Sequence, residues 1–452
     1  MNILIINGSP AGDDSITLQT VRYLQLVFPG HEWKQLNVVK RLKILEKDFS
    51  GAKALLEEAE LLLFAYPVYT FLAPAQLHSF IALMKSSGVG LAGKTATQLT
   101  TSKHFYDVTA HEYVRENCAD LGLKYIRGLS ADMEDLLTEK GQAEAKAFFD
   151  RVLWAMERGL DETLPRPAAA PFVAVPATIP PAEAALGNQK QVVVVADMGP
   201  EDAALSAMVE RFCRVCPSPV RVVNIRDFAF AGGCLGCFRC AASGECFYKD
   251  GYAELLRDRI QTADATVYAF TVRDHSMGCR FKYFDDRQFC NGHRTVTMGK
   301  PVGYLVDGPL SAEPNVRMLL EARAQVGGNH LCRIAGNERD TDGEIDRLAA
   351  ALDYDLRTGF REPANFYGTG GMKIFRDLIY TMQGLMREDH RFYKKHGFYK
   401  DFPQRHRGKI AAMYLVGAMM NSPKLNKKLG SNLTKGMLMP YEKVLAKVKT
   451  EK

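Results

Sequence analysis

The sequence predicts an α/β protein that contains two tandem, doubly wound parallel sheets and ends in a basic helical extension. Short apolar runs alternate with amphipathic segments in both halves of the 452-residue chain. A Pro- and Ala-rich stretch separates the halves, and the spacing of the runs repeats between them. A composition of 47% hydrophobic and 24% charged residues excludes a collagen, a disordered chain and a small disulfide-stapled scaffold.

The strands and helices follow from these runs. In the first half, the pattern predicts strands over residues 2–7, 60–66, 94–101 and 124–128, with helices over 16–27, 74–85 and 110–120. In the second half, it predicts strands over 191–197, 220–225, 265–271, 302–306 and 331–335, with helices over 203–213, 253–262, 315–325 and 344–356. Because the strands are continuously apolar, we expect helices on both faces of each sheet.

The domain boundaries follow from proline and from charge. Six prolines lie between Pro165 and Pro181, which excludes helix and central strand and indicates a semi-rigid linker. Residues 361–452 contain 19 Lys and Arg against 7 Asp and Glu, whereas the rest of the chain has a net charge of −6. We therefore predict domains at 1–163 and 188–358, a linker at 164–187 and a basic, Met-rich extension at 359–452. Such an extension most simply packs on the acidic body of its own chain or of a second copy.

A phosphate-binding loop is predicted at the end of the first strand. Gly8-Ser9-Pro10-Ala11 leads to Ser15-Ile16-Thr17 at the start of a helix, where backbone N–H groups and hydroxyls suit a phosphate. Pro67-Val68-Tyr69-Thr70 should lie beside it and can flank a flat ring, because ligands bind at the carboxyl edge of such sheets. The next loop, Thr101-Ser102-Lys103-His104, offers hydrogen-bond donors and a cation. Asp13 and Asp14 must then point away from the phosphate. The alternative is an ordinary strand–helix turn with Ser15 as the helix cap.

Four cysteines in the second half form a compact motif. Cys234, Cys237, Cys240 and Cys246 follow a predicted strand with the spacing C-x2-C-x2-C-x5-C, so their thiolates can converge on a cubane iron–sulfur cluster. A zinc knuckle, or a redox C-x-x-C pair with two spectators, stays open as an alternative. Four cysteines outside the motif are interpreted as buried or incidental: Cys118, Cys279, Cys290 and Cys332.

A zinc ribbon is a sharper alternative. Cys213-x2-Cys216 and Cys234-x2-Cys237 have ribbon-like spacing. In the predicted fold, however, the first pair ends a helix at the amino edge of the sheet and the second pair follows the carboxyl edge of the next strand. The strand between them would separate the pairs by roughly 20 Å, and one zinc ion cannot bridge that distance.

Together these motifs resemble a known family. Gly8-Ser9-Pro10 with Ser15 and Thr17, Pro67-Val68-Tyr69, the compact cysteine motif and the segment 282–287 (KYFDDR) resemble the iron–sulfur flavoproteins within the NADPH-dependent FMN reductase group. The resemblance covers residues 1–160 and 190–358 and implies two flavodoxin-like domains, FMN on the phosphate loop and a [4Fe-4S] cluster on the cysteines. In the family both sites share one domain, whereas here they are divided. The corresponding loop of the second half, 197–202 (DMGPED), would repel a phosphate, so one FMN is expected, in the first domain.

The expected function is an FMN-dependent oxidoreductase or electron-transfer flavoprotein, with NAD(P)H or a ferredoxin-like protein as donor and the cluster relaying single electrons. The two cofactors would meet within the chain or across a homodimer. No residue is assigned as the catalytic acid, although Lys103 or His104 could stabilise charge on a reduced flavin. A cytoplasmic location is expected, because residues 1–8 lack the features of a signal peptide. A homo-oligomer is also expected.

The alternative function is a zinc- or thiol-based binding or sensing module whose basic tail holds nucleic acid. Neither nucleic acid nor a membrane, beyond a peripheral contact, is an expected partner on the first hypothesis. The segment 88–95 (GVGLAGKT) matches a P-loop pattern. A P-loop requires a strand before it and a helix after it, and here a helix precedes and a strand follows, so we interpret it as a helix–strand turn.

Overall fold

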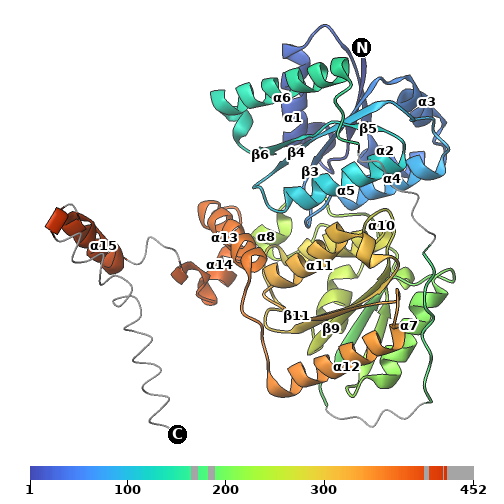
Figure 1. The fold of residues 1–452 in the computed structure, drawn as a ribbon, viewed down its shortest axis with the longest axis vertical. Helices are drawn as coiled ribbons and strands as arrows, with labels where there is room; N and C mark the ends of the chain where they lie inside the picture. Colours follow the sequence, from blue (N-terminus) through green and yellow to red (C-terminus); the bar gives the residue numbers. More distant parts are fainter. Residues whose placement is uncertain (164–171, 182–188, 402–406, 421, 425–452) are drawn as a thin grey trace. The chain divides into compact units, whose positions relative to one another are not determined.

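The computed structural model describes residues 1–163, 172–181, 189–401, 407–420 and 422–424. Residues Met1–Phe392 form one compact unit and Tyr393–Lys452 a second. The first unit contains two parallel sheets with helices on both faces, which are two flavodoxin-like α/β domains (Figure 1). Most of the predicted linker, 164–171 and 182–187, lies outside the described residues. Its central part, 172–181, runs along the second domain, where the backbone N–H of Val175 donates to Asn337 O at 2.9 Å.

The first sheet has the strand order β2-β1-β3-β4-β5, and β6 pairs with β4. Its strands are β1 (Asn2–Asn7), β2 (Glu32–Asn37), β3 (Leu61–Pro67), β4 (Thr95–Ser102), β5 (Lys124–Tyr125) and β6 (Leu129–Asp132). Its helices are α1 (Ile16–Val27), α2 (Val38–Leu45), α3 (Ser50–Glu58), α4 (Ala75–Ser86), α5 (Asp107–Asp120) and α6 (Glu139–Arg158). Apolar residues of α1 and α6 pack on one face of this sheet, and those of α3, α4 and α5 pack on the other.

The second sheet has the strand order β11-β10-β9-β7-β8. Its strands are β7 (Val192–Ala196), β8 (Val220–Asn224), β9 (Ala265–Thr271), β10 (Pro301–Asp307) and β11 (His330–Gly336). The helices are α7 (Ala203–Val215), α8 (Arg239–Ser243), α9 (Tyr252–Glu254) with a π-helical continuation (Leu255–Ile260), α10 (Cys279–Arg287), α11 (Pro314–Val326) and α12 (Thr341–Thr358). Helices α7 and α12 cover one face, whereas α10 and α11 cover the face that meets the first domain.

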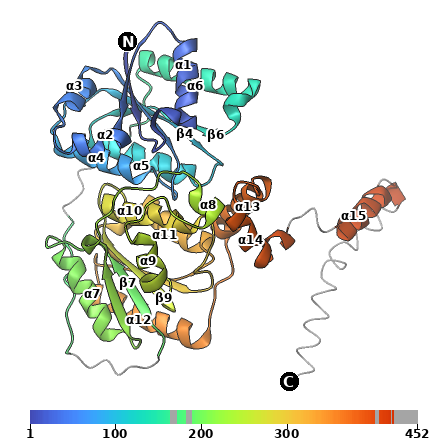
Figure 2. The same cartoon turned by 180° about the vertical axis from the view of Figure 1, so that it is seen from behind.

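A continuous apolar core joins the two domains. Helix α4 packs against α10, and α5 packs against α11 (Figure 2). Fully buried residues of both domains, such as Phe80 on α4 and Phe284 on α10, belong to the same cluster. Burial of this extent is what a folding core shows rather than a transient contact, so the two sheets are held in a defined relation within the first unit.

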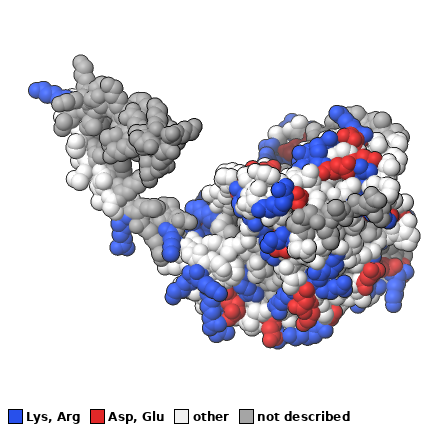
Figure 3. All heavy atoms as spheres, turned by 90° about the horizontal axis from the view of Figure 1, so that it is seen from below, with Lys and Arg blue, Asp and Glu red and all other residues white. Residues whose placement is uncertain are grey.

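The C-terminal extension is helical where it is described, as predicted. It contains α13 (Phe366–Thr381), which packs on α11, then α14 (Arg387–Lys395) and, in the second unit, α15 (Arg407–Met420). Among the described residues, no helix combines the length and the apolarity needed to cross a bilayer. On the face shown in Figure 3, basic and acidic side chains of the described residues are interspersed rather than gathered into a broad patch of one sign. The segment 88–95 lies between α4 and β4, so the predicted helix–strand turn is confirmed.

Candidate functional site

A cavity of about 380 Å³ lies where the carboxyl edge of the first sheet meets the second domain. This volume is within the range of small-molecule sites, about 300–1,000 Å³. Its lining includes twelve of the fourteen residues predicted to bind a cofactor, together with all four motif cysteines: Ser9, Ala11, Ser15, Ile16, Thr17, Pro67, Val68, Tyr69, Thr70, Thr101, Ser102, Lys103, Cys234, Cys237, Cys240 and Cys246. The two segments that were predicted to meet across an interface therefore meet within one chain.

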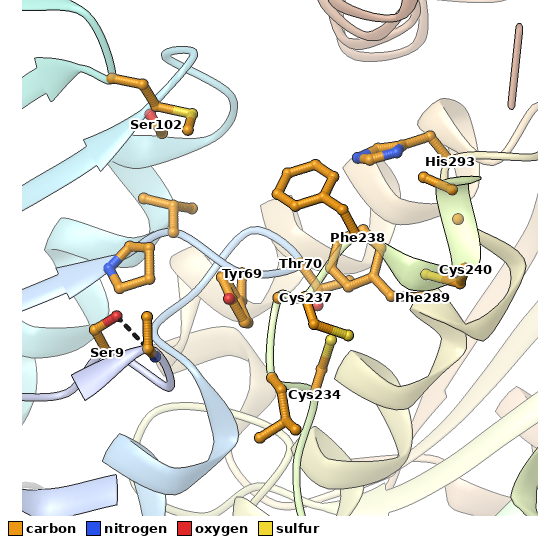
Figure 4. A pocket seen from close by; sticks show the side chains of 18 of the residues that line it. Ser9, Tyr69, Thr70, Ser102, Cys234, Cys237, Phe238, Cys240, Phe289 and His293 are labelled. Atoms are coloured by element: carbon orange, nitrogen blue, oxygen red, sulfur yellow. Dashed lines mark hydrogen bonds between the residues drawn. The ribbon is translucent and has the colours of Figure 1, made fainter. Parts of the chain in front are cut away.

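The loop after β1 is built as a ligand loop rather than as a simple turn. Ser15 occupies the position before α1, but its buried hydroxyl makes no capping hydrogen bond. The hydroxyls of Thr17 and Thr101 are 2.5 Å apart, which ties the start of α1 to the end of β4. Ser9 is buried and accepts the Ala11 N–H at 3.3 Å (Figure 4). Hydroxyls and the N-terminal end of α1 thus face the cavity, and this donor set fits a phosphate.

The two acidic residues of this loop behave differently. Asp13 points away, as a phosphate site requires, and accepts hydrogen bonds from Gln35 at 2.9 Å and Asn37 at 3.2 Å. These hydrogen bonds lower the pKa of Asp13. Asp14 lies on the cavity lining, where it is exposed to solvent. Only the first of the two carboxylates is therefore clearly removed from the position of a bound anion.

The other two loops of the first domain flank the cavity. Tyr69 is half-buried and lies between Ser9 and the Cys234–Cys237 pair in Figure 4. Burial raises the pKa of its hydroxyl, so Tyr69 stays neutral. Lys103 lines the cavity and is paired with Asp132 at 2.8 Å. Pro10 and His104 are not among the lining residues, and the half-exposed His104 side chain pairs with Asp107 at 3.0 Å.

The loop that carries the four motif cysteines, residues 232–250 and here called the cysteine loop, approaches the first domain closely. Gly236 has a φ of +62°, and a Cβ atom there would overlap the hydroxyl of Tyr69. Phe238 also has a positive φ, +56°, which turns the chain into α8 and presents Cys237 and Cys240 on the same side. Burial raises the pKa of the Cys240 thiol to about 11, so a metal would have to displace a proton there. All four motif cysteines are free thiols.

The four motif thiols are not drawn together as the ligands of a single zinc ion are. Four thiolates on one zinc, each about 2.3 Å from the metal, lie about 3.8 Å from one another. In the part of the chain that the structure describes, no three of these sulfurs lie within 4.8 Å of one another. A group that meets this limit is formed instead by Glu116, His275 and Glu313. In a cubane each thiolate binds a different iron, which allows wider spacing. Cys213 and Cys216 pack in the core beneath α7 and are not on the lining.

The equivalent loop of the second domain carries carboxylates in place of hydroxyls. Asp197 accepts a hydrogen bond from Arg226 at 2.5 Å, and Asp202 accepts one from Arg273 at 2.5 Å. Both carboxylates are buried. These pairs occupy the carboxyl edge of β7 with charges that are already neutralised, and they leave no hydroxyl set for a phosphate there.

Several lining residues carried no signal in the sequence. Cys290 is buried, as expected, but it lies on the wall of this same cavity. Ile374 and Phe375 of α13 close the cavity from the C-terminal extension, and the Phe375 ring packs on Phe105 at 4.1 Å between centroids. A periodic apolar stripe over α13 was the available sign. Asp286 and Arg287, which lie in the segment that resembles the family, prove to be separately paired, with Lys282 and with Asp250.

Comparisons with known proteins agree with this picture. A protein-family model described as a flavodoxin-like fold matches residues 1–133. A curated iron–sulfur flavoprotein from Archaeoglobus fulgidus is 27% identical over 174 residues, which are 36% of this chain and 79% of that protein. The resemblance that the motifs indicated is therefore confirmed.

Solved structures are also similar to part of this chain. The apo form of an NADH:FMN oxidoreductase is 20% identical, with a TM-score of 0.30 over 34% of this chain and 89% of its own. An FMN-dependent NADH-azoreductase from Bacillus anthracis, in complex with FMN, is 15% identical, with a TM-score of 0.26 over 33% of this chain and 98% of its own.

Proposed function

We propose that this protein is an FMN-dependent oxidoreductase that holds FMN on the loops of its first domain and a [4Fe-4S] cluster on Cys234, Cys237, Cys240 and Cys246 of its second. The observation that carries the proposal is the shared cavity, because a hydroxyl-rich loop at a helix N-terminus and four thiols face the same space. The curated relative, an iron–sulfur flavoprotein by name, supports the same pairing of cofactors.

The residues of this chain would bind and orient the cofactors. Ser9, Ser15 and Thr17 suit the FMN phosphate, and the Pro67–Thr70 segment suits one side of the isoalloxazine ring. When bound, FMN supplies two-electron and one-electron chemistry, and a cluster supplies single-electron transfer. Lys103 would offer positive charge near the ring, shared with Asp132. The apolar walls from Phe238 and Phe375 would exclude water from the space between the cofactors.

The electron donor belongs to one of two classes. Reduced NAD(P)H would deliver electrons as hydride, whereas a ferredoxin-like protein would deliver them singly. Two of the similar solved structures are named an NADH:FMN oxidoreductase and an FMN-dependent NADH-azoreductase. For this chain, steady-state reduction of the flavin by NADH, NADPH and a reduced ferredoxin, compared under anaerobic conditions, separates the two classes.

Anaerobic purification tests the proposal directly. We expect a brown protein with about one FMN and about four irons and four sulfides per chain. Cys234→Ser should lower iron and sulfide together and leave FMN in place. Cys332→Ser is the matched control. Cys332 lies on β11 and packs on the face of the second sheet that α7 and α12 cover, away from the first domain. Zinc without acid-labile sulfide, or a colourless protein with neither flavin nor iron, would contradict the proposal.

A further inference from the structure

Helix α10 buries three consecutive charged residues at the interface between the domains. Asp285, Asp286 and Arg287 are each 0–1% exposed, and Lys282, one turn earlier, is fully buried. Charges are expensive to bury and are retained only when each has a partner. Each of the three has a different partner. One set of partners lies in the loop between β3 and α4, residues 68–74, which we call the flavin-flanking loop. The others lie in the cysteine loop and in the second domain's own helix α11.

Asp286 holds the loop that follows β3 in the first domain. Its carboxylate accepts the Thr70 hydroxyl at 2.5 Å and the Ala75 N–H at 2.8 Å. Lys282 pairs with Asp286 and donates to the carbonyl oxygen of Tyr69 at 2.8 Å. Thr70 has a φ of +43°, which is rare for a β-branched residue. A strained turn persists when surrounding contacts enforce it, and here the enforcing groups come from the other domain.

Arg287 holds the cysteine loop. Its guanidinium donates to both carboxylate oxygens of Asp250, at 2.7 and 3.0 Å, and to the carbonyl oxygen of Gly232 at 2.9 Å. The same group lies over the ring of Tyr248, 4.4 Å from its centre. Gly232 and Asp250 bracket the segment that carries the four motif cysteines. Arg287 therefore closes the base of that loop with a bidentate pair and a stacked ring.

We propose that Asp286 and Arg287 are positioning residues that set the two halves of the cavity independently, Asp286 for the flavin-flanking loop and Arg287 for the cysteine loop. Because they are adjacent on one helix, α10 fixes how the two cofactor positions face each other. This inference rests on the proposed function, in that it assigns FMN to the first loop and the cluster to the second.

The test is a crossed pair of substitutions in the full-length protein, prepared anaerobically. Asp286→Asn should raise the Kd of added FMN about tenfold, since charged hydrogen bonds to the loop are lost, with iron and sulfide per chain unchanged. Arg287→Lys keeps the charge but loses the fork. It should lower iron and sulfide content at least twofold and alter the visible circular dichroism of the cluster, with the Kd of FMN within twofold of wild type.

Partners of the two residues provide a second route if a helix variant fails to fold. Thr70→Val removes the hydroxyl that donates to Asp286 and should reproduce the FMN effect. Asp250→Asn should reproduce the cluster effect. Asp285→Asn is the structural control, because Asp285 pairs with Arg323 on α11 at 2.9 Å. It should lower stability without moving either cofactor readout.

The outcomes separate the inference from the function beneath it. A wild-type protein with neither flavin nor iron and sulfide contradicts the proposed function. A wild-type protein that holds both cofactors, with Thr70→Val and Asp250→Asn losing both in parallel or losing neither, overturns the independent positioning. Crossed losses, each confined to one cofactor, support it.

Discussion

At the scale of single residues, Gly236 shows how closely the two cofactor loops approach each other. Its φ of +62° is costly for any other residue. A side chain there would also overlap the Tyr69 hydroxyl of the other domain. Gly251 supplies a matched control, because its φ is +82° and a Cβ there would meet nothing within 4 Å. Comparing substitutions at Gly251 and Gly236 therefore separates the cost of a left-handed backbone from the cost of the contact with Tyr69.

We therefore expect Gly251→Ala to lower the free energy of unfolding by about 1–2 kcal/mol, the cost of a left-handed residue. Gly236→Ala should lose about 1–3 kcal/mol more, because the half-buried Tyr69 must move. It should also reduce the iron content, which Gly251→Ala should not. Urea unfolding and iron analysis of the two variants measure this. Equal losses in both would show that the approach of Gly236 to Tyr69 has no energetic consequence.

The same scale explains why we propose a phosphate site in one domain and not in the other. At the end of β1 the loop offers Ser9, Ser15 and Thr17, whereas at the end of β7 it offers Asp197 and Asp202. The charges in the second loop are neutralised by arginines rather than by a ligand. A difference of a few side chains on similar backbones therefore decides where an anion can bind.

At the scale of elements, the buried strands were predictable, including the polar β4, and the solvated edge strand β2 was not. The strands around Leu61 and Ala265 are buried on both faces and were predicted to within one residue. Strand β2 (EWKQLN) was missed, because an edge strand is half solvated and its polar residues hide the pattern. Helix α10 was missed for a related reason. Its sequence, CRFKYFDDR, looks like an exposed segment, and only the partners in the other domain make its burial possible.

The candidate site divides in the same way. Loops next to predicted strands were placed correctly, because the topology brings the carboxyl ends of parallel strands together. The wall formed by α13 could not be predicted, since it depends on where a helix docks that begins about 300 residues after Thr70 of the flavin-flanking loop. Periodicity identifies an apolar face and does not identify its partner.

Helix α13 offers a test of that docking within one turn. Gly370 and Gly371 are adjacent, and a Cβ on Gly370 would meet nothing within 4 Å, whereas one on Gly371 would lie 2.5 Å from Val326 and 3.0 Å from Phe105. Gly370→Ala should stabilise the protein by about 0.5–1 kcal/mol through helix propensity. Gly371→Ala should be less stable than Gly370→Ala by about 1–3 kcal/mol because of overpacking. Chemical unfolding of both variants measures the difference, and equal stabilities would mean that α13 does not seat on α11 in this way.

At the scale of the whole molecule, the apolar interface between the domains also contains a cluster of charged residues around His275. His275, in the loop after β9, contacts Asp120 of α5 at 2.8 Å through Nε2 and Glu313 at 2.9 Å through Nδ1. Asp120 belongs to the first domain and Glu313 to the second. A neutral imidazole has one N–H and a protonated one has two, so both contacts are hydrogen bonds only while His275 is charged.

The charges around His275 favour the protonated form of its imidazole. Burial alone would lower the pKa of His275, but the hydrogen bonds to Asp120 and Glu313 outweigh burial and raise the pKa to about 9. Glu116 also lies within 4.8 Å of the imidazole. Lys85 opposes these carboxylates and pairs with Asp120 at 2.7 Å and Asp274 at 2.9 Å. Four carboxylates, those of Asp120, Glu313, Glu116 and Asp274, therefore surround one histidine and one lysine at the interface.

The raised pKa makes the stability of the interface depend on pH. A group whose pKa is higher in the folded state contributes fully below its unfolded value, about 6.5, and loses that contribution as the pH rises through the folded value. The free energy of unfolding should therefore fall by up to about 3 kcal/mol between pH 6.5 and pH 9. His275→Gln should be less stable at pH 6.5 and should lack this slope. The curves of the two proteins should then converge above pH 9.

His330→Gln, whose partner Asp355 lies in the same domain at 3.0 Å, should keep the slope. Urea unfolding across this range measures all three proteins. Parallel curves for wild type and His275→Gln would show that the histidine does not hold the domains together.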